Sequence, residues 1–64
     1  MTAAVAVWPQ AGTVHLSGEG YAPPRVLTPR QAIHHAAQLC GTNRPLAREI
    51  GACVGRIWQQ ERAA

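Results

Sequence analysis

The sequence contains no phenylalanine and no lysine, and each absence limits what the chain can be. Without phenylalanine, the core of this 64-residue chain must come from Leu, Ile, Val, Ala and the two tryptophans. A chain of this length is near the lower limit for folding on burial of apolar side chains alone. We therefore expect one small domain over residues 1–64, whose native form is a homodimer or is completed by a partner.

Because lysine is absent, all six basic residues are arginines, and they give a net charge of +3. The charge is unevenly placed, since residues 1–25 sum to zero and residues 26–64 carry the whole excess. A basic C-terminal part suits contact with phosphates or with an acidic protein surface. A GC-rich genome, which encodes arginine where others use lysine, explains the same composition without any binding role.

Long apolar runs are also lacking, and the N-terminal MTAAVAVW has no basic lead of the signal-peptide kind. We expect a soluble cytoplasmic protein that does not enter a membrane. Only three side chains are carboxylates, and neither a Ser-His-Asp set nor a cofactor fingerprint is visible. The sequence therefore predicts a protein without catalysis, cofactor or small-molecule substrate.

The two cysteines, Cys40 and Cys53, are expected to be free thiols that pack as small apolar groups. Together with His34 and His35 they offer four potential zinc ligands. However, adjacent histidines on a helix point about 100° apart, and no Cys-x-x-Cys pair is present. We expect no metal site and assign the histidines no catalytic role.

The N-terminal residues 1–18 are predicted to form a β-hairpin. Residues 3–8 carry β-branched side chains at every second position, and TVHLSG, from Thr13, alternates apolar and polar residues. Residues 9–12, PQAG, read as the turn between these strands. Residues 19–26 are expected to be a loop, because Gly20, Pro23 and Pro24 disfavour regular structure.

A first helix is predicted to begin after Thr28. This threonine is a good N-cap, Pro29 suits the first helical position, and Gln31 completes a capping box. The helix is expected to run to Gly41 as its C-terminal cap. Its apolar stripe is predicted to be Ile33, Ala36, Ala37 and Cys40, whose small side chains would let a partner helix approach closely.

The stretch from residue 45 to residue 62, PLAREIGACVGRIWQQER, allows two interpretations. In the favoured one, a helix ends at Gly51 and a second begins near Val54, which is the spacing of a helix-turn-helix. In the other, Leu46, Ile50, Cys53 or Val54, and Ile57 form one apolar stripe on a continuous helix. The continuous helix would hold two mid-helix glycines, each costing about 1 kcal/mol relative to alanine. The predicted fold class is therefore α+β, with an N-terminal hairpin followed by two or three helices over residues 27–64.

Two segments resemble DNA-binding families. LTPRQ at residues 27–31, together with LAREIG at residues 46–51, is similar to the opening of LuxR-type and sigma-factor region-four domains. IWQQER at residues 57–62 is similar to the recognition helix of homeodomain-like folds. The sequence departs from these patterns at Cys53, Gly55 and Gln60. The resemblance implies a helix-turn-helix domain that binds duplex DNA.

Two functions follow as hypotheses, of which binding to duplex DNA is favoured. In a DNA-binding transcriptional regulator, arginines and glutamines would contact phosphates and base edges. In a phage- or prophage-encoded inhibitor, tryptophan and arginine would instead dock on an acidic host protein, since both are enriched in interface hot spots. The residues expected to bind DNA or the protein partner are the same: Arg44, Arg48, Arg56, Trp58, Gln59, Gln60 and Arg62.

Overall fold

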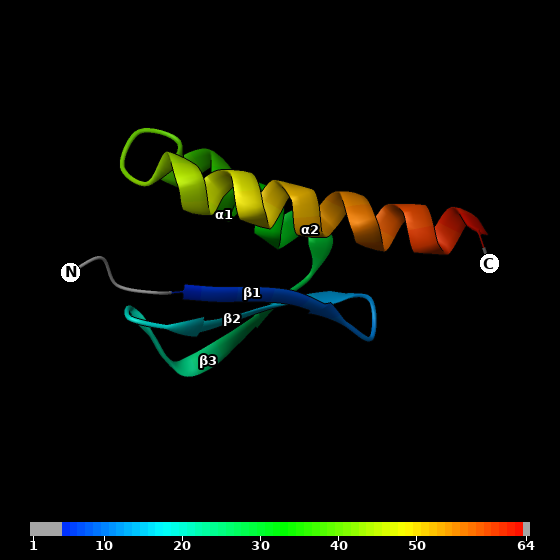
Figure 1. Ribbon diagram of the computed structural model, residues 1–64, viewed down its shortest axis with the longest axis horizontal. Coiled ribbons are helices and arrows are strands. Elements are labelled where there is room, and N and C mark those ends of the chain that lie inside the picture. The colour runs from blue at the N-terminus through cyan, green and yellow to red at the C-terminus, as the bar shows by residue number, and fades with distance from the viewer. Residues whose placement is uncertain (1–4, 64) are drawn as a thin grey trace.

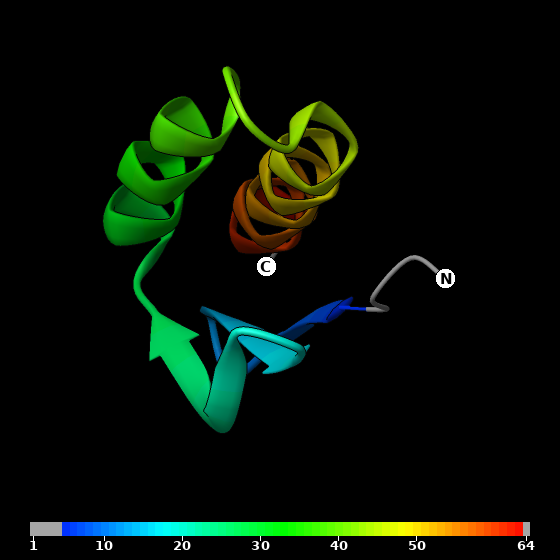
Figure 2. The same ribbon diagram turned by 90° about the vertical axis from the view of Figure 1, so that its left-hand side faces the viewer.

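A computed structural model describes residues 5–63, which form a three-stranded antiparallel sheet followed by two helices. The elements in chain order are β1 Val5–Gln10, β2 Thr13–Gly18, β3 Tyr21–Leu27, α1 Pro29–Leu39 and α2 Arg44–Ala63. The sheet forms one layer and the helices form the other (Figure 1). Seen along their axes in Figure 2, the two helices lie side by side over one face of the sheet. The expected α+β class is confirmed, with two helices.

The expected hairpin is present in β1 and β2, with a shorter turn than the sequence suggests. Gln10 pairs with Thr13, so only Ala11 and Gly12 connect the strands. Their φ angles are 53° and 76°, and two left-handed residues in succession make the type I′ turn that fits the twist of a hairpin. Pro9 and Gln10 belong to β1 and not to the turn, because Pro9 is tolerated in an edge strand. Residues 3 and 4 of the expected strand lie outside the described residues.

The expectation of a loop over residues 19–26 is wrong, because Tyr21–Leu27 is the third strand. It pairs with β2, from Gly18↔Tyr21 to Val14↔Leu27, and the register shifts between Leu16 and Gly18. The two prolines of β3 fit because this strand is the other edge of the sheet. Successive residues of a strand direct their N–H groups to opposite sides, so only one of the two prolines lacks a donor on the free side. The other falls where the register with β2 is irregular, and such a position also tolerates a proline. The Ala22–Pro23 peptide bond is cis.

Helix α1 begins as predicted. The Gln31 backbone N–H donates to Thr28 Oγ1 at 3.2 Å, and the Thr28 N–H donates to Gln31 Oε1 at 3.1 Å, which completes the capping box. The other end differs, because the cap is Cys40 in a right-handed conformation. The backbone N–H of Asn43 donates to Leu39 O at 2.7 Å, so the exposed end of α1 is satisfied without a left-handed glycine.

Helix α2 is one continuous helix from Arg44 to Ala63, so the predicted turn at Gly51 is absent and the continuous interpretation is confirmed. Residues 51–53 are helical, and neither glycine of α2 has a positive φ. The glycine cost is offset by an apolar stripe that buries Leu46, Ala47, Ile50, Cys53, Val54 and Ile57. Burial of one such side chain contributes about 1.5–3 kcal/mol, which exceeds the cost of one glycine.

The core lies between the inner face of the sheet and the helices. Leu16, Ile50, Ile57, Val14 and Val54 are its largest fully buried side chains. Of the apolar stripe predicted for α1, Ala36 is buried as expected, but Ile33 is 42% exposed and Ala37 and Cys40 are exposed. The other buried residue of α1 is Ala32, which was not predicted. Because Ala32 and Ala36 face the core, His35 lies against β3, where its Nε2 and the Tyr21 hydroxyl share a hydrogen bond.

Candidate functional site

The seven residues expected to bind a partner all lie on α2, and all of them are exposed. The helix that carries them is anchored at its start by Asn43, whose Oδ1 accepts from the Leu46 N–H at 3.3 Å and whose backbone O accepts from the Ala47 N–H at 3.1 Å. Proline at position 45 needs no intrahelical donor in this first turn. The buried stripe then fixes the rotation of the helix, and thereby decides which side chains point outward.

These exposed residues do not form a single face. Successive helical residues are separated by about 100°, so positions can be related to Ile50, which faces the core. Arg48 and Gln59 lie roughly opposite Ile50, and Arg44 and Arg62 lie about 120° from it on one side. We call Arg44, Arg48, Gln59 and Arg62 the outward face of α2.

Arg56 and Gln60 lie on the opposite flank, about 120° and 80° from Ile50 in the other direction. Arg56 is thereby turned toward β1, together with Glu49. Trp58 lies on the flank nearer the outward face and is 47% exposed. The structure therefore brings four of the seven residues together, places Trp58 beside them and separates Arg56 and Gln60.

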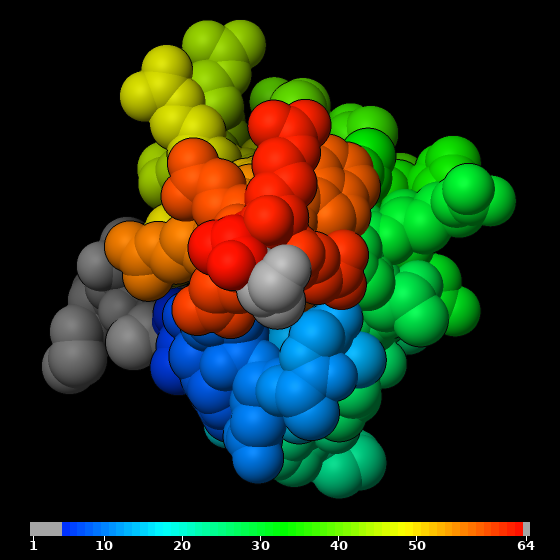
Figure 3. Space-filling model, turned by 90° about the vertical axis from the view of Figure 1, so that its right-hand side faces the viewer, coloured from blue at the N-terminus to red at the C-terminus, as the bar shows by residue number. Residues whose placement is uncertain are grey.

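Small residues occupy the outward side of α2 between Arg48 and Gln59. Gly51 and Ala52 are exposed, and Gly55 is half-buried. A Cβ atom added at either glycine would meet no other atom within 4 Å, so no contact within the chain requires these glycines. The end-on view in Figure 3 shows the last turns of α2, orange to red, stacked on the β1–β2 hairpin with α1 beside them.

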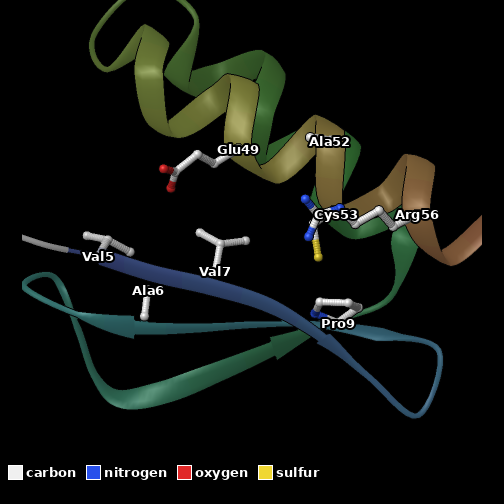
Figure 4. Close-up of a pocket in the computed structure, with 8 residues that line it drawn as sticks. All are labelled: Val5, Ala6, Val7, Pro9, Glu49, Ala52, Cys53 and Arg56. Carbon is white, nitrogen blue, oxygen red and sulfur yellow. The ribbon is translucent and has the colours of Figure 1, made fainter.

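A hollow of about 380 Å³ lies between β1 and the flank of α2 that carries Glu49 and Arg56. Figure 4 shows Val5, Val7 and Pro9 below it and Glu49, Cys53 and Arg56 above it. Glu49 was not predicted as a surface feature, because the β1 residues that it faces across the hollow are distant from it in the sequence. The signal available in the sequence was the seven-residue spacing of Glu49 and Arg56, which places both side chains on one flank of a helix, two turns apart.

Burial raises the pKa of the Cys53 thiol above its ordinary value, and the neighbouring Arg56 guanidinium partly offsets this shift. A thiol with a raised pKa stays protonated at neutral pH and is a weak nucleophile. Both cysteines are free, as expected, with Cys53 buried and Cys40 exposed. Only Cys53 packs in the core, so the expectation that both would pack holds for one of them.

Among residues 5–63, no group of three or more His, Cys, Asp or Glu side chains is arranged to hold a metal ion. Two of the histidines, His15 and His35, make other contacts. His15 stacks on Trp8 across the β1–β2 pair with ring centroids 5.6 Å apart, and Thr13 Oγ1 lies 3.0 Å from His15 Nε2. In the same described range, neither helix combines the length and the apolar character needed to cross a membrane.

Comparison with protein families, with characterised proteins and with solved structures finds no match to the chain. The likeness to helix-turn-helix families therefore rests on the short segments at residues 27–31, 46–51 and 57–62. In the structure the first of these caps α1, and the other two belong to the same helix, α2. Function must be inferred from the exposed surfaces themselves.

Proposed function

We propose that this protein is a small binding module that docks the outward face of α2, with Trp58 at its border, on an acidic surface of another protein. The observation that carries the proposal is the continuity of α2 from Arg44 to Ala63. A straight helix of 20 residues presents one ridge along about 30 Å, which suits a groove on a partner.

The chemistry of this ridge favours a protein as the partner. Trp58 is 47% exposed although its indole is large and apolar, and Arg62 lies four residues from it on the same helix. Tryptophan and arginine dominate the energetics of protein interfaces, where the aromatic ring fills a pocket and the guanidinium pairs with carboxylates. The glycines at positions 51 and 55 would let the partner lie close to the helix backbone.

A module that covers an acidic surface acts as a competitor of whatever else binds there. This is the action expected of an inhibitor, including one encoded by a phage or prophage, and it requires no catalytic group in the module itself. Arginines outnumber acidic residues in the C-terminal part of the chain, so this part is positively charged and favours a negatively charged partner surface.

Duplex DNA is the second candidate, and one observation favours it. The four residues of the outward face are three arginines and one glutamine, without a carboxylate between them. Such a face can follow phosphates, with Gln59 available to a base edge. DNA binding of this kind would use the length of α2 and not the two-helix recognition of a helix-turn-helix domain.

The test compares matched variants in two binding assays. Arg48→Ala and Trp58→Ala remove one charge and one aromatic ring from the proposed docking region, while Arg30→Ala removes one exposed charge from α1. In affinity capture from the host, followed by measurement of direct binding to the purified partner, the first two variants should lose at least about tenfold in affinity, and Arg30→Ala should not.

A titration with random duplex DNA at low and moderate salt decides between the candidates. If the partner is a protein, DNA should bind weakly and equally for wild type and Trp58→Ala. If DNA is the partner, Arg48→Ala should weaken binding and flatten the salt dependence by about one unit of slope. If neither assay distinguishes Arg48→Ala from Arg30→Ala, the assignment of the outward face of α2 as the docking surface is refuted.

A further inference from the structure

Among residues 5–63, no strand lies beside the outer edge of β1, so the backbone hydrogen-bonding ladder is open there. In a hairpin with a two-residue turn the closing pair, here Gln10 and Thr13, is a hydrogen-bonded pair, and bonded pairs then alternate along the strands. The bonded partners of β2 are therefore positions 10, 8 and 6 of β1. Val5, Val7 and Pro9 direct their backbone groups away from β2, and Pro9 lacks the N–H that would point there.

The same three residues face the hollow beneath α2. Val5, Val7 and Pro9 are half-buried, whereas Ala6, Trp8 and Gln10 are exposed on the other face. The free edge of β1 and the hollow are thus one continuous feature, with unpaired backbone groups at its rim and apolar side chains inside (Figure 4). A strand added to β1 would pair its backbone and close the hollow at once.

The flank of α2 above the β1 edge carries one negative side chain, Glu49, followed by one positive side chain, Arg56. Glu49 and Arg56 are seven residues apart, roughly 10 Å along the helix, and both border the hollow. Between them, Ala52 presents only a methyl group and is exposed. Val7 lies below the interval between the two charges (Figure 4).

We propose that two copies of the chain associate through this edge, with β1 of one copy antiparallel to β1 of the other and the two α2 helices side by side above them. The symmetry axis passes close to Val7 in the sheet and to Ala52 in the helical layer. Rotation about this axis reverses α2, so Glu49 of each copy faces Arg56 of the other. The charge order of a single helix flank is thereby complementary to itself, which is the property a two-fold interface requires.

The remaining surfaces agree with this arrangement. Val7 pairs with Val7 of the second copy, and the Val5 N–H meets the Pro9 carbonyl, so the missing N–H of Pro9 leaves one acceptor unused in each copy. The two hollows join and become closed by Val5 and Val7 from both copies. The outward faces of the two α2 helices stay uncovered and lie next to each other, so the dimer presents a doubled arginine ridge.

Analytical ultracentrifugation of purified wild-type protein and charge variants tests the interface. Wild type should be a dimer at micromolar concentration. Glu49→Arg and Arg56→Glu each create two like-charge contacts across the axis and should raise the dimer dissociation constant at least about tenfold. The double variant, with both substitutions, restores opposite charges and should return the dissociation constant to near the wild-type value.

The control is Arg48→Glu, which makes the same charge change as Arg56→Glu but on the outward face. It should remain dimeric while losing partner binding, so that failure of the interface and failure of the docking face are distinguished. Circular dichroism would establish that each variant is folded. The proposal is overturned if wild type remains monomeric at high micromolar concentration, or if the double variant does not restore the dimer. If the monomer instead binds a foreign extended peptide, the β1 edge is assigned to that peptide and not to a second copy.

Discussion

The two glycines within α2 give a prediction in which the sign of the effect is decided by the structure. Gly51 and Gly55 have helical backbone conformations, and at both positions an added Cβ meets nothing within 4 Å. Alanine is favoured over glycine in a helix interior by about 1 kcal/mol, mainly because glycine loses more backbone entropy on folding. We expect Gly51→Ala and Gly55→Ala each to raise the free energy of unfolding by about 1 kcal/mol.

In a domain of this size, 1 kcal/mol corresponds to a rise in Tm of about 4–8 °C. The two added methyl groups share no buried contact, so the double variant should gain about 2 kcal/mol. Thermal denaturation followed by circular dichroism at fixed protein concentration measures both quantities. The concentration must be fixed because association would shift Tm by itself.

Gly12→Ala is the matched control. Its added Cβ also meets nothing within 4 Å, but the φ of Gly12 is 76°, so the same substitution is opposed by backbone strain. It should lower stability by about 1–2 kcal/mol. If Gly51→Ala instead lowered Tm while Gly55→Ala raised it, Gly51 would occupy a turn, and the continuity of α2 would be refuted together with the functional argument that depends on it.

The other predictions concern the core, the helix cap and the buried thiol. Ile50→Ala and Leu46→Ala remove buried side chains and should each cost about 2–5 kcal/mol in urea denaturation, and an unchanged midpoint would contradict their burial. Thr28→Ala breaks the capping box and should cost about 1 kcal/mol, measured in the same way. Because the folded pKa of Cys53 is raised, the stability linked to this thiol is complete below about pH 8.5 and is lost as pH rises through the folded pKa. The difference in unfolding free energy between wild type and Cys53→Ala should therefore shrink at alkaline pH, and a constant difference would exclude this linkage.

Local signals in the sequence predicted the parts of the fold that local interactions determine. The capping box at Thr28 and Gln31 was predicted in full, and the hairpin turn was predicted two residues too long; both act within four residues. The third strand could not be found in this way, because β3 contains two consecutive prolines and is held by pairing with β2 and by core contacts of Tyr21 and Leu27, which are not local in the sequence. Its prolines are compatible with a strand only at an edge, and the position of an edge is a property of the whole sheet.

The choice at Gly51 shows the same limit. Glycine propensity favoured a break, whereas six buried residues on one side of α2 favour continuity, and tertiary burial outweighs propensity. The exposed residues were identified from the sequence, but their separation into an outward face and a β1-facing flank required the rotation of the helix. The rotation of α2 is set by its packing against the sheet. The spacing of apolar residues in the sequence did not determine it, because that spacing left open whether the helix continues through the glycines.

The two edges of the sheet differ in a way that bears on how the protein behaves when it is concentrated. On β3 the register with β2 is irregular in the stretch that holds Pro23 and Pro24, whereas β1 pairs with β2 without a shift from Val5 to Gln10 and lacks only the donor of Pro9. An irregular edge is a poor template for a further strand. A sheet that accepted strands at both edges could extend without limit, as in fibrils. If β1 pairs with a second copy as proposed and β3 resists addition, growth ends after a single pairing event. Replacing the two prolines with β-branched residues would remove that limit and turn a self-terminating chain into one able to form fibres.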